Sequence, residues 1–162
     1  MKSARRRSRE LALQGLYAWQ LAGDNAAGLQ SQLAESKGFR KADAEYFSRL
    51  LRGTIAHAEA LERLIAPVLD RKLKELSPVE RGILLLAAFE LKNATDIPYK
   101  VVINEAIELA KDFGGTDGHK YVNGVLDRLA AVVRASEVAA PRDARARKAP
   151  ARARTTARKA EE

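Results

Sequence analysis

Residues 97–126 read IPYKVVINEAIELAKDFGGTDGHKYVNGVL and carry the clearest structural pattern in the chain. Pro98 marks the entry to a helix, because proline is tolerated only in the first turn, and the apolar residues after it recur in steps of three and four. Gly114 and Gly115 are expected to end this helix in a left-handed cap. Thr116 is the expected N-cap of a second amphipathic helix. The stretch therefore predicts a helical hairpin with a short polar corner at residues 116–123.

A second strong helix signal comes before the hairpin, at residues 77–91. Ser77 is the expected N-cap, Pro78 takes the first helical position, and Glu80 completes a capping box. The run LLLAAF at residues 84–89 is apolar on most sides of a helix. We therefore expect this helix to lie buried at the centre of the fold.

Weaker helical patterns cover residues 4–22, 29–35 and 41–66, with a further turn or two before residue 76. Gly53 lies inside the third pattern and leaves two alternatives open, a break or a close helix contact. Glycine and proline are sparse, and no run of β-branched residues alternates with period two. The sequence thus predicts an all-α fold. The aromatic residues on the apolar stripes are expected in its core, namely Tyr17, Trp19 and Tyr46.

Composition limits the class of protein. Hydrophobic residues make up 46% of the 162 residues, which is enough for a sizeable core. The chain has no cysteine and no apolar run of the roughly 18–20 residues that a membrane span needs. These features predict a cytoplasmic protein without disulfides and without a membrane partner.

The positive charge lies at the two ends of the chain. The formal net charge is +8, of which residues 1–10 carry +4 and residues 135–162 carry +4, so residues 11–134 are neutral. The C-terminal stretch is rich in alanine and arginine, and it is expected to be disordered because it has too few large apolar residues to form a core. This distribution is typical of a neutral folded body with polyanion-binding ends.

No constellation of residues indicates catalysis or metal binding. His57 and His119 have no partner at metal-ligand spacing, and no phosphate-binding loop is present. The sequence therefore predicts a protein that is not an enzyme and uses no cofactor, metal or small-molecule substrate.

Two groups of residues are candidates for binding single-stranded RNA, which proteins recognise with cations and aromatic platforms. Arginines at the N-terminus would supply cations, and Tyr121 in the corner would supply a platform for a base. The alternatives are a solvated basic end and a Tyr121 that covers the core. A protein that binds nucleic acid without sequence preference, through its basic tail, is the other function that the charge pattern allows.

Three motifs resemble the NusB family of bacterial transcription antitermination factors: SARRRSRELALQGLYAW at 3–19, SPVERGILLLAAFEL at 77–91, and the hairpin stretch. The resemblance implies about seven helices in two small subdomains, 1–76 and 77–134, followed by the tail 135–162. It also implies binding of boxA-type RNA together with NusE, which is also a small-subunit ribosomal protein. Other Nus factors and RNA polymerase are the implied wider assembly.

The resemblance also assigns residues. The family's basic N-terminus and its DxHKxVN corner, both expected on the RNA side, fall on Lys2, Arg5, Arg6, Arg7 and Arg9 and on Asp117, His119, Lys120, Tyr121 and Asn123. The expected contacts with the protein partner are Glu80, Tyr99 and Lys100.

Overall fold

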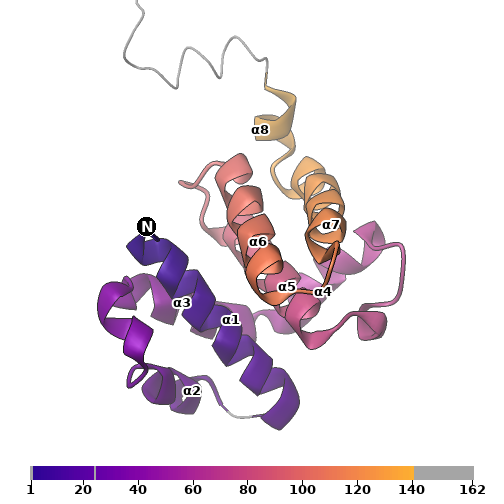
Figure 1. Ribbon diagram of the computed structural model, residues 1–162. Coiled ribbons are helices and arrows are strands. Elements are labelled where there is room, and N and C mark those ends of the chain that lie inside the picture. The colour runs from indigo at the N-terminus through magenta and orange to yellow at the C-terminus, as the bar shows by residue number, and fades with distance from the viewer. Residues whose placement is uncertain (1, 24, 141–162) are drawn as a thin grey trace, which may run out of the picture.

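The computed structural model describes residues 2–23 and 25–140, and all of its regular elements are helices (Figure 1). The predicted all-α fold is confirmed, with eight α-helices in the described residues where about seven were expected. The α-helices are α1 (Ala4–Ala22), α2 (Ala26–Leu33), α3 (Ala44–Ala56), α4 (Ala58–Ile65), α5 (Pro78–Asn93), α6 (Tyr99–Phe113), α7 (Gly118–Val133) and α8 (Ala135–Ala139). Three short 3-10 helices complete the set: η1 (Lys37–Lys41), η2 (Ala66–Val68) and η3 (Leu73–Glu75).

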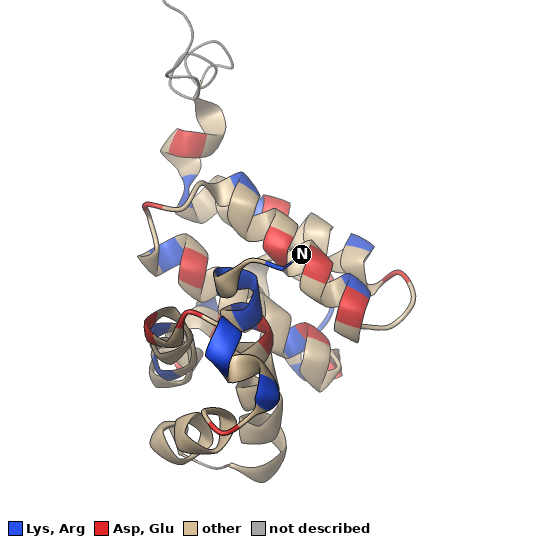
Figure 2. Ribbon diagram, turned by 60° about the vertical axis from the view of Figure 1, so that its left-hand side comes forward, with Lys and Arg blue, Asp and Glu red and all other residues tan. Residues whose placement is uncertain are grey.

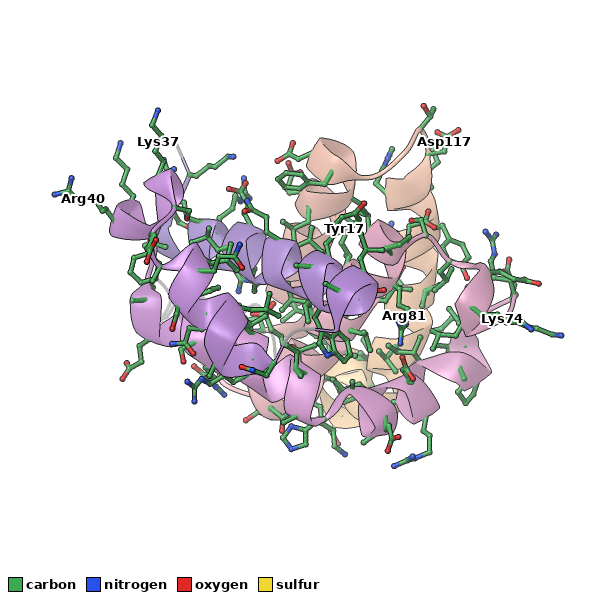
Figure 3. The ribbon with its side chains drawn as sticks, turned by 90° about the horizontal axis from the view of Figure 1, so that it is seen from below. Tyr17, Lys37, Arg40, Lys74, Arg81 and Asp117 are labelled. Atoms are coloured by element: carbon green, nitrogen blue, oxygen red, sulfur yellow. The ribbon has the colours of Figure 1, made fainter. Side chains whose placement is uncertain are left out.

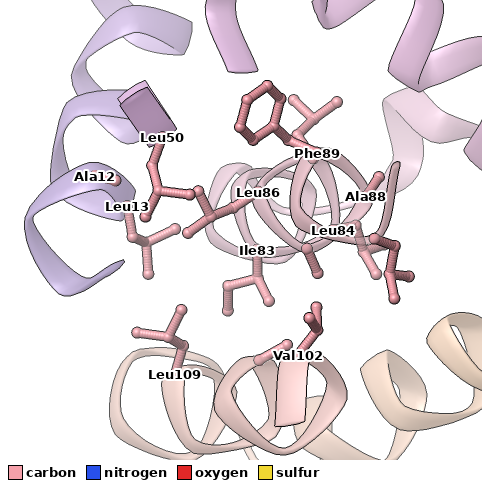
Figure 4. Close-up of a cluster of buried hydrophobic side chains, with 14 of the residues drawn as sticks. Ala12, Leu13, Leu50, Ile83, Leu84, Leu86, Ala88, Phe89, Val102 and Leu109 are labelled. Carbon is pink, nitrogen blue, oxygen red and sulfur yellow. The ribbon is translucent and has the colours of Figure 1, made fainter. Parts of the chain in front are cut away.

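Helix α5 is the centre of the fold, as its sequence predicts. Its capping box forms, with Glu80 N donating to Ser77 Oγ at 3.1 Å and Ser77 N donating to Glu80 Oε1 at 3.4 Å. Residues 82–91 are all buried, and α5 packs against α1, α3, α4, α6 and α7. Figure 4 shows side chains from three sides meeting there, with Leu13 of α1 and Leu109 of α6 beside Ile83.

The buried apolar side chains form one continuous cluster that runs from α1 through α5 to α7. Helices α1, α2 and α3 pack on one another, and so do α5, α6 and α7. Because α5 also contacts α1 and α3, the core is shared between the two halves. The subdomain boundary at residue 76 therefore stays a prediction.

The predicted long helix over residues 41–66 is two helices, α3 and α4, which meet at His57. Gly53 is not the break. A Cβ added at Gly53 would lie 2.3 Å from Phe89 Cζ, so the absent side chain lets the Phe89 ring of α5 pack directly on α3. Of the two alternatives, close packing is the correct one.

The hairpin turn differs from its sequence prediction. Gly114 is extended, with φ −90° and ψ 178°, and the left-handed residue is Asp117, with φ 66°. Thr116 is not the N-cap, because α7 begins at Gly118 with Asp117 before it. Aspartate tolerates the left-handed region better than most non-glycine residues. Gly114 is instead required for space, since a Cβ there would lie 2.7 Å from the Ala110 carbonyl oxygen.

The first residues of the stretch that was expected to be disordered from residue 135 are helical. Residues Ala135–Ala139 form α8, which packs on α7. Arg134 Nη1 pairs with Glu137 at 2.6 Å, and the Glu137 carboxylate in turn accepts from Tyr99 N at 2.9 Å. The remainder of the predicted tail, residues 141–162, lies outside the described residues.

A buried ion pair fastens the start of α1 to α5. Arg9 and Glu90 are 4% and 2% exposed, and Arg9 donates to both Glu90 oxygens, with Nη2 2.8 Å from Oε2. The Tyr46 hydroxyl of α3 also donates to Glu90. Burial and the Glu90 carboxylate raise the pKa of Tyr46, which keeps this hydroxyl protonated. The network thereby links α1, α3 and α5.

A second ion pair fastens α1 to α6. Arg6 Nε and Nη2 donate to the two Glu105 oxygens at 3.0 and 2.9 Å, and Arg9 Nη1 lies 3.5 Å from Glu105 Oε1. The hydrogen bonds from Arg6 hold the pKa of Glu105 below its ordinary value of 4.5. Figure 2 shows the basic first turns of α1 next to the acidic positions of α6.

We expect Arg9→Ala to lower the free energy of unfolding by about 3–5 kcal/mol, because it leaves the Glu90 carboxylate buried without its cation. The matched control is Arg7→Ala, two residues away, which removes no partner in the described structure and should change stability by less than about 0.5 kcal/mol. Urea unfolding followed by circular dichroism measures both. If both substitutions lowered the free energy of unfolding equally, the buried Arg9–Glu90 pair would not be the source of the loss.

The Glu105 pair should respond to pH. Because the folded-state pKa is depressed, its stabilisation is complete above the unfolded-state pKa, near 4.5, and is lost as pH falls through the folded value. We expect Glu105→Gln to cost about 1 kcal/mol at pH 7 and progressively less below pH 4.5. The test measures the unfolding free energies of the unmodified chain and of Glu105→Gln from pH 7 down to pH 3.5. If the difference between the two proteins did not change with pH, the Arg6–Glu105 ion pair would not be its source.

Candidate nucleic-acid interface

The five cations of the N-terminal arm (Lys2, Arg5, Arg6, Arg7 and Arg9) do not face the same environment. Ser3 caps α1 by accepting from Arg6 N at 3.0 Å, so the arginines occupy its first two turns. Arg9 is held inside the protein by Glu90, and Arg6 is held by Glu105. Arg9 is therefore not placed to meet a phosphate at the surface, in contrast to its sequence-based assignment.

The other three arm cations remain accessible. Lys2 pairs with Glu10 at 2.7 Å and keeps 44% of its side chain exposed. Arg5 lies 4.2 Å above the Tyr46 ring, with Asp43 3.9 Å away, and is 45% exposed. Arg7 is partly exposed and has no ion-pair or hydrogen-bond partner for its side chain in the described part of the chain. These three are the arm cations that α5 and α6 do not engage, while Arg6 keeps 32% of its side chain exposed beside Glu105.

Two exposed aromatic side chains lie at the other end of the α1–α6 pair. Both helices run downward in Figure 1, and Arg6 near the start of α1 pairs with Glu105 in the middle of α6. Tyr17 and Phe113 follow Leu13 and Leu109 by four residues, on the same faces. Each ring is 43% exposed. Tyr17 is therefore not in the core, in contrast to its sequence prediction, because the periodicity of a helix does not show where the helix extends beyond its neighbours.

The corner that follows α6 is polar and open. Asp117 and Lys120 pair at 3.3 Å with side chains 66% and 73% exposed, and Asn123 is exposed as well. His119 is half-buried. A shallow hollow at this corner is lined by Lys111, Gly114, Gly115, Thr116, Asp117 and His119.

Tyr121 is less open than a free base platform would be. Its ring is half-buried against the core, and its hydroxyl is buried without a hydrogen-bond partner among the described residues. The Arg71 guanidinium carbon lies 4.1 Å from the ring centroid. Burial, with the neighbouring Asp70 carboxylate, raises the pKa of Tyr121. Tyr121 therefore packs on the core, as one of the two alternatives expected, and Arg71 covers its ring; its role as a base platform stays a prediction.

A second hollow lies between the end of α1 and the start of α5, and it was not signalled by the sequence. Gln20 bridges the two helices, donating to Pro78 O at 2.8 Å and accepting from Arg81 Nη1 at 3.1 Å. Arg81 also pairs with Glu62. Figure 3 shows Tyr17 in the middle of this face, with Asp117 above it and Lys74 to the right. The hollow is lined by Gln20, Leu21, Lys72, Leu73, Lys74, Leu76, Pro78 and Arg81.

The three expected partner contacts are not in one place. Glu80 lies at the corner, where a Cβ added at Gly118 would be 3.3 Å from its Oε2. Tyr99 and Lys100 lie at the opposite end of α6, where Tyr99 N donates to Glu137. A helix of this length separates its ends by roughly 20 Å.

Two negative observations apply to the described residues. No helix among them is long and apolar enough to cross a membrane. Nor do three His, Cys, Asp or Glu side chains there gather in a way that could hold a metal ion.

Comparison with known proteins shows the family. The model of the NusB family matches residues 6–131. The transcription antitermination protein NusB of Paraburkholderia phytofirmans is 61% identical over 142 residues, which cover 88% of this chain and 99% of that protein. NusB of T. maritima, a solved structure, aligns with a TM-score of 0.70 and 37% identity over 80% of this chain and 92% of that one.

A further solved structure is that of the antitermination factors NusB and NusE in complex with dsRNA, which aligns with a TM-score of 0.72 and 29% identity over 78% of this chain and 96% of that chain. The three motifs that carried the resemblance all lie in the matched region or at its edge. The chain belongs to the NusB family.

Proposed function

We propose that this chain is a transcription antitermination factor that binds boxA-type single-stranded RNA together with a NusE-type ribosomal protein. Other Nus factors and RNA polymerase complete the assembly on the nascent transcript. Its action is binding without catalysis, cofactor or metal, and it takes place in the cytoplasm. The P. phytofirmans relative, a transcription antitermination protein over nearly its full length, supports the biological role.

The observation that carries the RNA proposal is the arrangement of accessible groups along α1 and α6. Lys2, Arg5 and Arg7 supply cations at one end, where phosphates would bind. Tyr17 and Phe113 supply exposed rings at the other end, where unpaired bases would stack. The two ends are roughly 15 Å apart along α1, a distance that a short single strand bridges.

The corner completes the proposed interface. Asp117, Lys120 and Asn123 are exposed polar groups that can pair with base edges, and His119 borders the same hollow. The complex with NusE named above contains double-stranded RNA. We favour a single strand for this chain because exposed rings have no stacking partner in an intact duplex.

The three proposed partner contacts lie at two places. Glu80 lies beside the corner, and its position there supports a role next to the RNA. Tyr99 and Lys100 stay the proposed contacts for the NusE-type partner, at the far end of α6. RNA and partner protein would then occupy separate ends of the hairpin.

Sequence-independent binding is the second candidate function, and the charge distribution favours it. Residues 135–162 carry a formal net charge of +4 on a stretch with almost no large apolar residue. Such a segment attracts any polyanion by counterion release, with an affinity that falls steeply with salt.

Titration of the chain with boxA-type RNA and with a scrambled RNA separates the two functions. We expect a preference for boxA-type RNA that the NusE-type partner increases, and that survives when the chain is shortened after residue 140. If the full chain bound both RNAs equally and the shortened chain bound neither, the sequence-independent function would be favoured.

Arg7→Ala should weaken RNA binding and lower the slope of log affinity against log salt by about 0.7, the value for one phosphate contact on a single strand. The protein should melt as the unmodified chain does, because Arg7 has no partner in the described structure. Fluorescence anisotropy at several salt concentrations gives the slope. An unchanged slope would remove Arg7 from the interface.

A further inference from the structure

The loop between η2 and η3 brings an arginine onto the corner. Arg71 of this loop lies over the Tyr121 ring of α7, with its guanidinium carbon 4.1 Å from the ring centroid. Asp70 Oδ1 accepts from Arg71 Nε at 3.0 Å, which fixes the guanidinium at one of its three nitrogens. Both side chains stay open to solvent, Arg71 at 44% and Asp70 at 64% exposure.

The Tyr121 ring is held by the protein, and the Arg71 guanidinium over it is open to solvent. Tyr121 rests against the hydrophobic core, so the ring is a fixed base for the guanidinium. The terminal nitrogens of Arg71 have no partner within the part of the chain that the structure describes, and they remain available as donors. The guanidinium is therefore supported by the Tyr121 ring and remains accessible from solvent.

Unpaired RNA bases stack on arginine guanidinium planes as they do on aromatic rings. A base that approached Tyr121 directly would first have to displace Arg71. A base that stacked on Arg71 would keep the existing contact and add a second one. The arrangement therefore favours Arg71, and not the bare tyrosine ring, as the surface that meets the RNA.

We propose that Arg71, supported by Tyr121 and oriented by Asp70, forms a stacking site for one unpaired base of the bound RNA. This inference rests on the proposed RNA-binding function and adds a residue that neither the sequence motifs nor the arm supplied. It assigns Tyr121 the role of a positioning residue beneath the cation. Lys72 of the same loop and Lys74 of η3 follow Arg71 and would face the backbone of the same strand.

The test measures affinities of the full chain for boxA-type RNA and for scrambled RNA by fluorescence anisotropy. Arg71→Lys keeps the charge and removes the planar group, so we expect about a tenfold loss for boxA-type RNA, an unchanged salt slope and little change for scrambled RNA. Tyr121→Phe keeps the ring and should bind within twofold of the unmodified chain, whereas Tyr121→Leu should lose as much as Arg71→Lys. Arg63→Lys, an exposed arginine of α4, is the matched control.

A scan of the RNA with single abasic nucleotides locates the base. At one position, the abasic substitution should weaken binding about tenfold for the unmodified chain and not at all for Arg71→Lys, since the two changes remove the same contact. If the loss from Arg71→Lys added to the loss from the abasic nucleotide at every position of the RNA, the stacking site would be overturned.

Two other outcomes have different meanings. If the unmodified chain prefers boxA-type RNA and Arg71→Lys binds as tightly, Arg71 acts as a point charge or as a loop tether, and this inference alone is overturned. If the unmodified chain shows no preference, the proposed function fails, and the inference fails with it.

Discussion

The pairing of Arg9 with Glu90 in the protein interior is the interaction on which the arrangement of the interface depends. A buried guanidinium and carboxylate are tolerated only when each satisfies the other, and here both oxygens of Glu90 accept from Arg9. Removing one partner would leave the other charge buried and unpaired, so the helices are held in the orientation in which Arg9 and Glu90 meet. Because Arg9 lies on α1 and Glu90 on α5, this pair sets how the basic arm lies on the central helix.

Arginine thus has two roles in the first turns of α1. Arginines that face α5 and α6 find carboxylates there and hold the arm in place, whereas Arg7 and its accessible neighbours point away from those acids. An ordered arm reduces the conformational entropy that binding would otherwise cost. Acidic residues on α6 also explain why a helix start rich in cations is tolerated, since they offset the unfavourable interaction of those cations with the helix dipole.

Much of the fold could be predicted from the sequence because it depends on local signals. The capping box at Ser77, the apolar run of α5 and the stripes of α6 and α7 each specify a helix without reference to the rest of the chain. The break at His57 could not be predicted in this way. No local residue marks it, and the nearby Gly53 serves close packing against Phe89 instead. The turn before α7 was also mispredicted, because two glycines were a more prominent signal than the aspartate that adopts the left-handed conformation.

The candidate interface was less predictable than the fold, since it depends on which charges find partners across the molecule. Nothing in the spacing of the arm distinguishes Arg9 from Arg7, and nothing near Arg71 indicates that it covers Tyr121. The central claim is therefore best tested at the arginine side chains themselves, by NMR of their Nε–Hε groups during titration with boxA-type RNA. The account predicts that the Arg9 signal is slow to exchange with solvent and does not move, while those of Arg5 and Arg7 shift. A large shift of Arg9, or the loss of its protection when RNA binds, would contradict it.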